Sequence, residues 1–117
     1  MQLRTAGLLY DIHQAAQYIV EDTEGGTFET FVGNRLVRQT VERNITILAE
    51  AINRLVRRDP DTASRISDIP RLVGMRNILI HEYDEIDYAT VWRTVEESVP
   101  ILLREAETLL QEAPPLE

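Results

Sequence analysis

The residues best suited to chemistry lie in one short stretch, Arg76–Tyr83 (RNILIHEY), which contains one of only two histidines in the chain. Histidine titrates near neutral pH, so His81 can take the proton of a ribose 2′-hydroxyl or return a proton to a leaving oxygen. Arg76 can stabilise the negative charge of a phosphorane-like transition state. Asn77 can orient a phosphate or hold the His81 ring in one tautomer, and Tyr83 can position a substrate. Together these residue types could carry out metal-free phosphodiester chemistry on RNA.

A regular helix would not bring Arg76 and His81 together. Successive residues turn by about 100°, so these two side chains diverge by roughly 140°, whereas Asn77 and His81 share a face. Joint action on one phosphate requires that the helix unwinds near His81, or that a second copy of the chain contributes across a two-fold axis. A symmetric dimer would join two copies of Arg76, His81 and Tyr83 in one cleft. A purely structural interpretation also exists, in which these polar residues cap the carbonyls at a helix end.

Length and composition restrict what can surround this stretch. The chain has 117 residues, which fits a single domain over 1–117. It has no cysteine, which excludes disulfides and thiolate ligands and argues against structural zinc, while its many carboxylates leave a hard cation such as magnesium open. We assign no metal and no cofactor. Met1–Arg4 does not resemble a signal peptide and no stretch reaches the roughly 18 apolar residues of a membrane span, so we expect a cytoplasmic protein without membrane contact.

The charge of the chain is unevenly distributed. The net charge of −8 disfavours binding to a polyanion. Residues 35–76 nevertheless carry nine arginines against five acidic residues, and all twelve basic residues of the chain are arginine. Arginine binds phosphate through two parallel hydrogen bonds, although solvated helix faces explain such residues equally well. We keep five arginines as candidates for RNA contacts but leave them out of the predicted site: Arg38, Arg43, Arg54, Arg57 and Arg58.

Apolar spacing predicts an all-α antiparallel bundle of about four to five helices. The predicted helices cover 3–24, 35–58, 70–81 and 88–112, with a short helical turn at 27–32, a loop or short turn at 61–69 and a frayed tail at 113–117. We expect Phe28 and Phe31 to pack on the core from the short turn, Asn34 and Asp87 to act as N-caps, and Pro100 to kink the last helix. His13 lies beside the stripe of the first helix and receives no functional role.

Met75–Tyr83 resembles the central motif of the HepT-like branch of the HEPN ribonucleases, which is Arg, four residues, His, one residue and Tyr. Ile69-Pro70 opens the motif helix as in that branch, and Ile86-Asp87 with Val91-Trp92 follows at the expected distance. Upstream, Leu48–Ala51 is similar to a family segment that usually carries glycine where this chain has Ala49. In length and helix order the resemblance covers essentially the whole chain.

The resemblance implies an all-α bundle that dimerises with its motif helices facing a shared cleft. It implies metal-independent cleavage of RNA, such as tRNA or mRNA, carried by Arg76 and His81 with Asn77 and Tyr83 in support. It also implies a toxin of a type VII-like toxin–antitoxin pair, whose nucleotidyltransferase antitoxin attaches AMP to Tyr83. The expected partners are therefore RNA, a second copy of the chain and that antitoxin, with which the dimer could form a higher assembly.

Two other functions stay open. The acidic surface fits a non-catalytic HEPN module that binds a nucleotide or serves as the partner subunit of a nucleotidyltransferase. The apolar seams alone would suffice for a helical dimerisation protein. The intact pair of Arg76 and His81 favours the ribonuclease over both.

Overall fold

The computed structural model describes residues 3–79 and 86–113, and every regular element in these ranges is a helix. The helices are α1 (Leu3–Thr23), α2 (Phe28–Gly33), α3 (Arg35–Arg58), α4 (Pro60–Ala63), α5 (Ile69–Leu79), α6 (Tyr88–Glu97) and α7 (Val99–Glu112). The all-α prediction is confirmed. None of these described helices is long and apolar enough to cross a bilayer.

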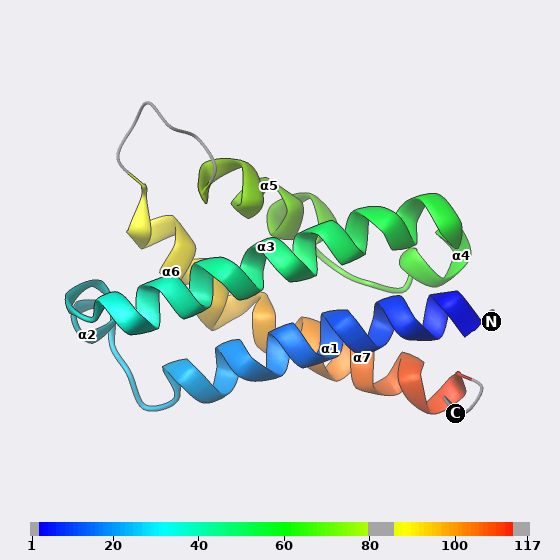
Figure 1. Cartoon of the computed structure of the whole chain (residues 1–117), viewed down its shortest axis with the longest axis horizontal. Coiled ribbons are helices and arrows are strands. Elements are labelled where there is room, and N and C mark those ends of the chain that lie inside the picture. The colour runs from blue at the N-terminus through cyan, green and yellow to red at the C-terminus, as the bar shows by residue number, and fades with distance from the viewer. Residues whose placement is uncertain (1–2, 80–85, 114–117) are drawn as a thin grey trace.

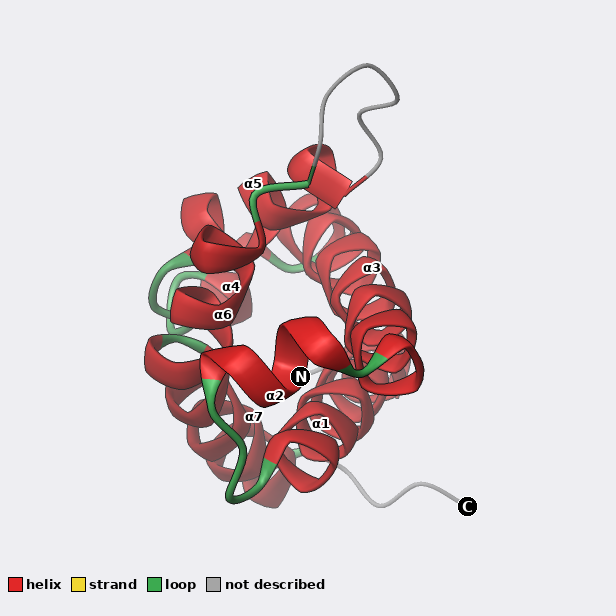
Figure 2. Cartoon of the chain, turned by 90° about the vertical axis from the view of Figure 1, so that its left-hand side faces the viewer, coloured by secondary structure: helices red, strands yellow, loops and turns green. Residues whose placement is uncertain are grey.

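The bundle is organised around α1 and α3, which lie side by side and run in opposite directions (Figure 1). α7 packs against α1, while α4 and α5 pack against α3. Viewed along the bundle, α1, α3 and α7 surround a common interior together with the shorter helices (Figure 2). α5 contains the first part of the predicted motif, and it packs on α3 rather than on α1.

The interior is filled by apolar stripes that run along the helices. The α1 and α3 stripes are almost completely buried: Leu9, Ile12, Ala16 and Ile19, then Val41, Ile45, Leu48, Ile52 and Leu55. The prediction for Phe28 is wrong, since its side chain is 37% exposed whereas Phe31 is 2% exposed. Phe31 stacks on Trp92 with ring centroids 5.2 Å apart and so fills the space beneath α2. That leaves Phe28 on the solvent side of a helix too short to bury both rings.

Local hydrogen bonds set the sharp connection from α1 to α3. Gly25 has a φ of +74°, a left-handed conformation that glycine adopts without a Cβ clash. Thr27 and Thr30 form a reciprocal capping box at the start of α2, with Thr27 N donating to Thr30 Oγ1 at 2.8 Å. The predicted N-cap of α3 is confirmed, because the Asn34 side chain accepts a bond from Val37 N at 3.2 Å.

Asp59 joins three helices where α3 ends. Its carboxylate accepts bonds from the backbone and hydroxyl of Thr62 in α4 at 3.1 and 2.8 Å, and from the hydroxyl of Thr5 in α1 at 3.1 Å. These bonds, led by the Thr62 hydroxyl, lower the pKa of Asp59 below its ordinary value. The short turn predicted within 61–69 is therefore a capped helical turn that begins at Pro60.

The predicted last helix is two helices. α6 begins after the N-cap Asp87, as predicted, but ends at Glu97, and α7 begins at Val99. The division lies at Ser98, two residues before Pro100, because proline cannot donate a backbone hydrogen bond and is tolerated best in the first turn of a helix. The Ser98 hydroxyl instead donates to Asp68 Oδ2 at 3.1 Å, which ties the break to the segment before α5.

We predict that Asp59→Ala lowers the free energy of unfolding by about 1 kcal/mol at neutral pH, the usual cost of deleting an N-cap. A carboxyl with a lowered folded-state pKa stabilises the fold above its unfolded pKa and loses that effect as pH falls through the folded pKa. The difference between wild type and variant should therefore shrink below about pH 4. Urea unfolding followed by circular dichroism across pH 2–7 measures this difference.

Asp61→Ala is the matched control, because Asp61 lies in the same short helix and its carboxylate accepts no hydrogen bond from the described residues. It should change stability less than Asp59→Ala. An Asp59→Ala effect that stays constant down to pH 2 would show that the carboxylate charge is not what stabilises this junction.

Candidate functional site

α5 carries the first half of the predicted motif and is held on α3 by apolar contacts. Leu72 and Met75 are 2% and 3% exposed, so they anchor α5 on α3. Met75 immediately precedes Arg76 in the sequence. Ile69 begins α5 and Pro70 takes its second position, which needs no backbone N–H. α5 is described to Leu79. The burial of Met75 fixes the direction in which the adjacent Arg76 leaves the helix.

Arg76 is oriented by α3. Its Nη2 lies 3.5 Å from Glu50 Oε1 and its side chain is 31% exposed. Its Nε is buried without a hydrogen-bond partner among the described residues. A buried donor that lacks a partner is costly, and such groups are rare in folded proteins. The guanidinium is thus held near Glu50, while the side chain stays partly accessible to solvent.

Of the remaining predicted site residues, the structure describes only Asn77. Asn77 is exposed, one position after Arg76, so it points to solvent rather than to α3. His81 and Tyr83 lie outside the described residues. Their approach to Arg76, and the sharing of a face by Asn77 and His81, stay predictions.

Glu50 is a site residue that sequence reasoning missed. It occurs within the segment Leu48–Ala51, where it drew attention only as part of a family resemblance. The one available signal was a carboxylate on the solvent side of the α3 seam, near the arginine-rich part of the chain. Many exposed glutamates share that description, and only the packing of α5 on α3 selects Glu50 as the partner of Arg76.

Arg38 contacts Tyr88 of α6 and the backbone of α2. Its guanidinium lies over the ring of Tyr88, 5.6 Å from the centroid, and also donates to the carbonyl of Val32. Burial raises the pKa of the neighbouring Glu42 carboxyl, and the charge of Arg38 opposes that rise more weakly. Arg38 therefore helps to fix the start of α6.

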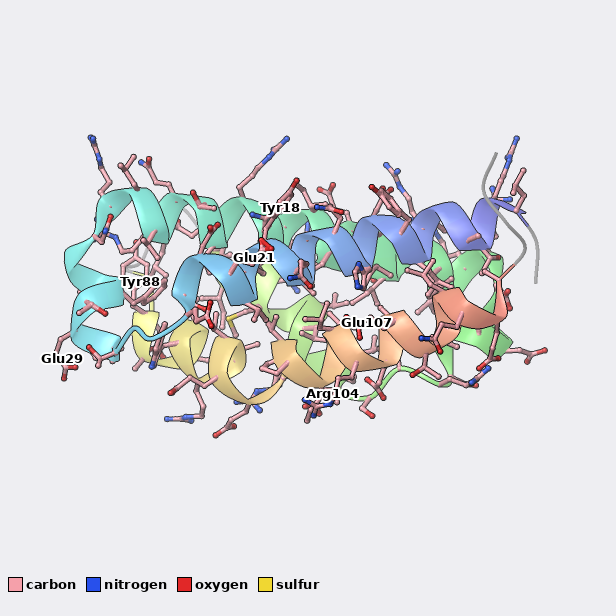
Figure 3. All side chains as sticks on the ribbon, turned by 90° about the horizontal axis from the view of Figure 1, so that it is seen from below. Tyr18, Glu21, Glu29, Tyr88, Arg104 and Glu107 are labelled. Carbon is pink, nitrogen blue, oxygen red and sulfur yellow. The ribbon has the colours of Figure 1, made fainter. Side chains whose placement is uncertain are left out.

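The second histidine lies elsewhere in the bundle. His13 of α1 is 3.3 Å from the carboxylate of Glu107 on α7, and Figure 3 shows Glu107 on the α7 ribbon beside α1. This contact gives the ring a polar partner at the edge of the core, as expected for a histidine without a functional role. Among the described residues, no three His, Asp or Glu side chains come close enough together to hold a metal ion.

Comparison with known proteins identifies related sequences along most of the chain. A family model described as ribonuclease HepT-like matches residues 12–109. A protein from Methanocaldococcus jannaschii named "Putative RNase" is 37% identical over 85% of this chain and 90% of its own length. A "Probable ribonuclease HepT" from Thermococcus cleftensis is 33% identical over 86% of this chain and 91% of its own length. A "Putative RNase" from Caldanaerobacter subterraneus is 29% identical, covering 88% and 91% respectively. No solved structure gives a significant match.

We predict that apolar contacts, rather than the ion pair with Glu50, hold α5 in place. A half-exposed ion pair contributes about 0–1 kcal/mol, so Glu50→Gln should change the free energy of unfolding by less than about 1 kcal/mol. Leu72→Ala removes a buried side chain from the same interface and should cost about 2–5 kcal/mol. Urea unfolding of both variants makes the comparison. A loss for Glu50→Gln as large as the one expected for Leu72→Ala would mean that the ion pair anchors α5.

Proposed function

Because the chain belongs to the HepT-like ribonuclease family, we propose that it cleaves RNA without a metal ion, using Arg76 and His81. The observation that carries this proposal is the state of Arg76. Its Nη2 lies 3.5 Å from Glu50 Oε1, and its side chain remains 31% exposed. A cation held in this way suits a phosphate group that gains negative charge during reaction, since a donor fixed in advance needs no reorganisation.

The chemistry follows from the residue types. His81 accepts the proton of a ribose 2′-hydroxyl, and the 2′-oxygen attacks the adjacent phosphorus. The bond from phosphorus to the 5′-oxygen breaks, which leaves a cyclic phosphate on one fragment. The departing 5′-oxygen takes up a proton from a second donor. Arg76 stabilises the additional charge on the phosphoryl oxygens, Asn77 orients the phosphate, and Tyr83 positions the substrate.

A symmetric dimer would complete this site. Arg76 and His81 diverge by roughly 140° on a regular helix, so one helix does not present both to one phosphate. Two copies that face each other across a two-fold axis would supply Arg76 from one protomer and His81 from the other, and a second His81 to protonate the leaving oxygen. Arg76 lies at the surface of α5 and is therefore accessible to a second protomer.

We further propose regulation as the toxin of a toxin–antitoxin pair, with tRNA or mRNA as the RNA substrate. In this scheme a nucleotidyltransferase antitoxin directs the Tyr83 hydroxyl onto the α-phosphorus of ATP, and pyrophosphate leaves. The attached AMP would place a negative charge and a bulky group two residues from His81, which would exclude an RNA phosphate by repulsion and by volume. The acidic residues of the segment, Glu82, Asp84 and Glu85, would then face the antitoxin rather than RNA.

We predict that the purified chain cleaves total tRNA in EDTA and that His81→Ala and Arg76→Ala each reduce the rate by at least about a hundredfold. His13→Ala is the matched control, because it removes the other histidine from the α1–α7 contact. It should cleave at the wild-type rate. Denaturing gel electrophoresis of end-labelled RNA measures the rate, and circular dichroism confirms that each variant is folded.

Three outcomes would contradict this prediction. Cleavage that requires added magnesium would remove the metal-free mechanism. No cleavage by a wild-type protein whose intact mass shows Tyr83 unmodified would favour the non-catalytic binding module. Equal loss in the His13→Ala and His81→Ala variants would indicate a folding defect common to both.

We predict that Tyr83 is the only tyrosine that receives AMP. Wild-type chain, co-expressed with a nucleotidyltransferase of the same host, should gain the mass of one AMP and lose RNA cleavage. Tyr83→Phe should gain no mass, because phenylalanine has no hydroxyl to attack ATP. Tyr18→Phe is the control, since Tyr18 is 47% exposed on α1 and offers an accessible hydroxyl elsewhere. Intact mass spectrometry reads all three proteins, and modification of Tyr83→Phe would place the acceptor elsewhere.

A further inference from the structure

An open groove with a volume of about 830 Å³ lies between the first half of α1 and the last turns of α3. Its α1 wall includes Arg4, Tyr10 and Asp11, and its α3 wall consists of Arg54, Arg57 and Arg58. The groove uses none of the residues of the predicted motif. Gly7 and Leu8 complete its lining, and the combination of cations with an aromatic ring is suited to a polyanion that carries flat rings.

The groove is a basic region in an acidic protein. Four of the twelve arginines of the chain line it, against one acidic residue, Asp11, while the chain as a whole carries a net charge of −8. Within the described ranges none of these four guanidinium groups forms a salt bridge, whereas Arg65, Arg71 and Arg76 each contact a glutamate. The groove therefore keeps its positive charge available to a ligand instead of neutralising it internally.

The chemistry of the lining favours a single strand of nucleic acid. Guanidinium groups on facing walls can bind successive phosphates through paired hydrogen bonds. Tyr10 is 49% exposed and can stack on a base, which is an interaction that tolerates any sequence. Bases of a duplex are already stacked on each other, so this ring adds affinity only for unpaired nucleotides. A small anion would use the arginines but leave Tyr10 without a role.

The groove is connected to the predicted site through α3. Glu50, which contacts Arg76, precedes Arg54 by four residues and Arg57 by seven, so these three side chains follow one face of the helix. Arg54 lies only about 6 Å further along the helix axis than Glu50. Arg76 and the α3 wall of the groove therefore lie on the same side of α3, with the Glu50 carboxylate between them.

We propose that this groove binds a single-stranded segment of the RNA substrate outside the scissile phosphodiester. The proposal rests on the proposed ribonuclease function for the identity of the ligand. Arg54, Arg57 and Arg58 from α3 and Arg4 from α1 contact phosphates, and Tyr10 stacks on an unpaired base. Asp11 opposes the phosphates at one edge and limits how far the strand extends over α1.

Binding of RNA, rather than its cleavage, tests the groove separately from catalysis. Each protein carries His81→Ala to prevent cleavage, and fluorescence anisotropy follows a labelled, unstructured RNA oligonucleotide over a series of salt concentrations. The groove variant is Arg54→Gln with Arg57→Gln, which removes two positive charges and retains good helix formers. The matched control is Arg104→Glu, which changes the net charge by the same amount on α7, away from α3 (Figure 3).

We expect the groove variant to bind the oligonucleotide roughly tenfold more weakly at low salt, with a salt dependence shallower by about 1.4 in log–log slope. The control should bind as the parent does. Tyr10→Ala should weaken binding of the single strand and leave binding of a duplex of the same length unchanged. Circular dichroism and light scattering establish that each variant keeps its fold and its oligomeric state.

Four results would overturn the proposal. They are absence of RNA binding by the parent, unchanged binding by the groove variant, equal weakening by Arg104→Glu, and a groove variant that alters oligomeric state or antitoxin binding while RNA affinity stays the same. The last would make the groove a protein interface. A parent that binds RNA through the groove, alongside a wild-type chain that does not cleave RNA, would leave the groove standing and remove the ribonuclease function.

Discussion

The burial of one face of α3 is the constraint on which the rest of the structure depends. Val41, Ile45, Leu48, Ile52 and Leu55 lie along that face, and α1, α4 and α5 all pack on the same helix. Apolar burial at about 25 cal/mol per Å² provides the main favourable term in folding, so this seam fixes where every neighbouring helix lies. Once it is buried, the opposite face of α3 must point outward. Glu50, Arg54 and Arg57 occupy that outward face. The burial of the apolar face therefore fixes the direction in which these polar side chains point.

Much of this fold can be predicted from the sequence because its signals are local. Apolar residues at spacings of three and four identify the helices, and Asn34 and Asp87 identify two helix starts, since a side chain that caps a helix reaches only two or three residues. The break at Ser98 is different. A proline inside an apolar stripe fits a kinked helix or two separate helices, and the stripe alone does not choose between them. The Ser98 hydroxyl also bonds to Asp68, 30 residues away in the sequence, which no local pattern predicts. The exposure of Phe28 likewise follows from a distant contact, because Phe31 rather than Phe28 stacks on Trp92.

The candidate site divides in the same way. Arg76 can be found by residue type and spacing, because a histidine and an arginine so close together are unusual in this chain. Glu50 cannot be found in that way, since its role follows from the contact between α5 and α3. The groove is also a tertiary feature. Arg4 and Tyr10 come from the first helix, Arg54 and Arg57 come from the third, and neither segment alone resembles a nucleic-acid site. Composition indicated only that residues 35–76 were basic.

An acidic protein can bind RNA if its positive charge is local. At physiological salt the Debye length is about 8 Å, so exposed acidic residues much farther than this from a bound phosphate are largely screened. In the proposed complex the arginines of the groove and Arg76 would act by direct contact, where screening is weak. The overall negative charge then slows the approach of RNA and disfavours non-specific contacts. Binding should thus depend on strands that reach both the groove and Arg76, which couples affinity to correct placement of the scissile phosphate.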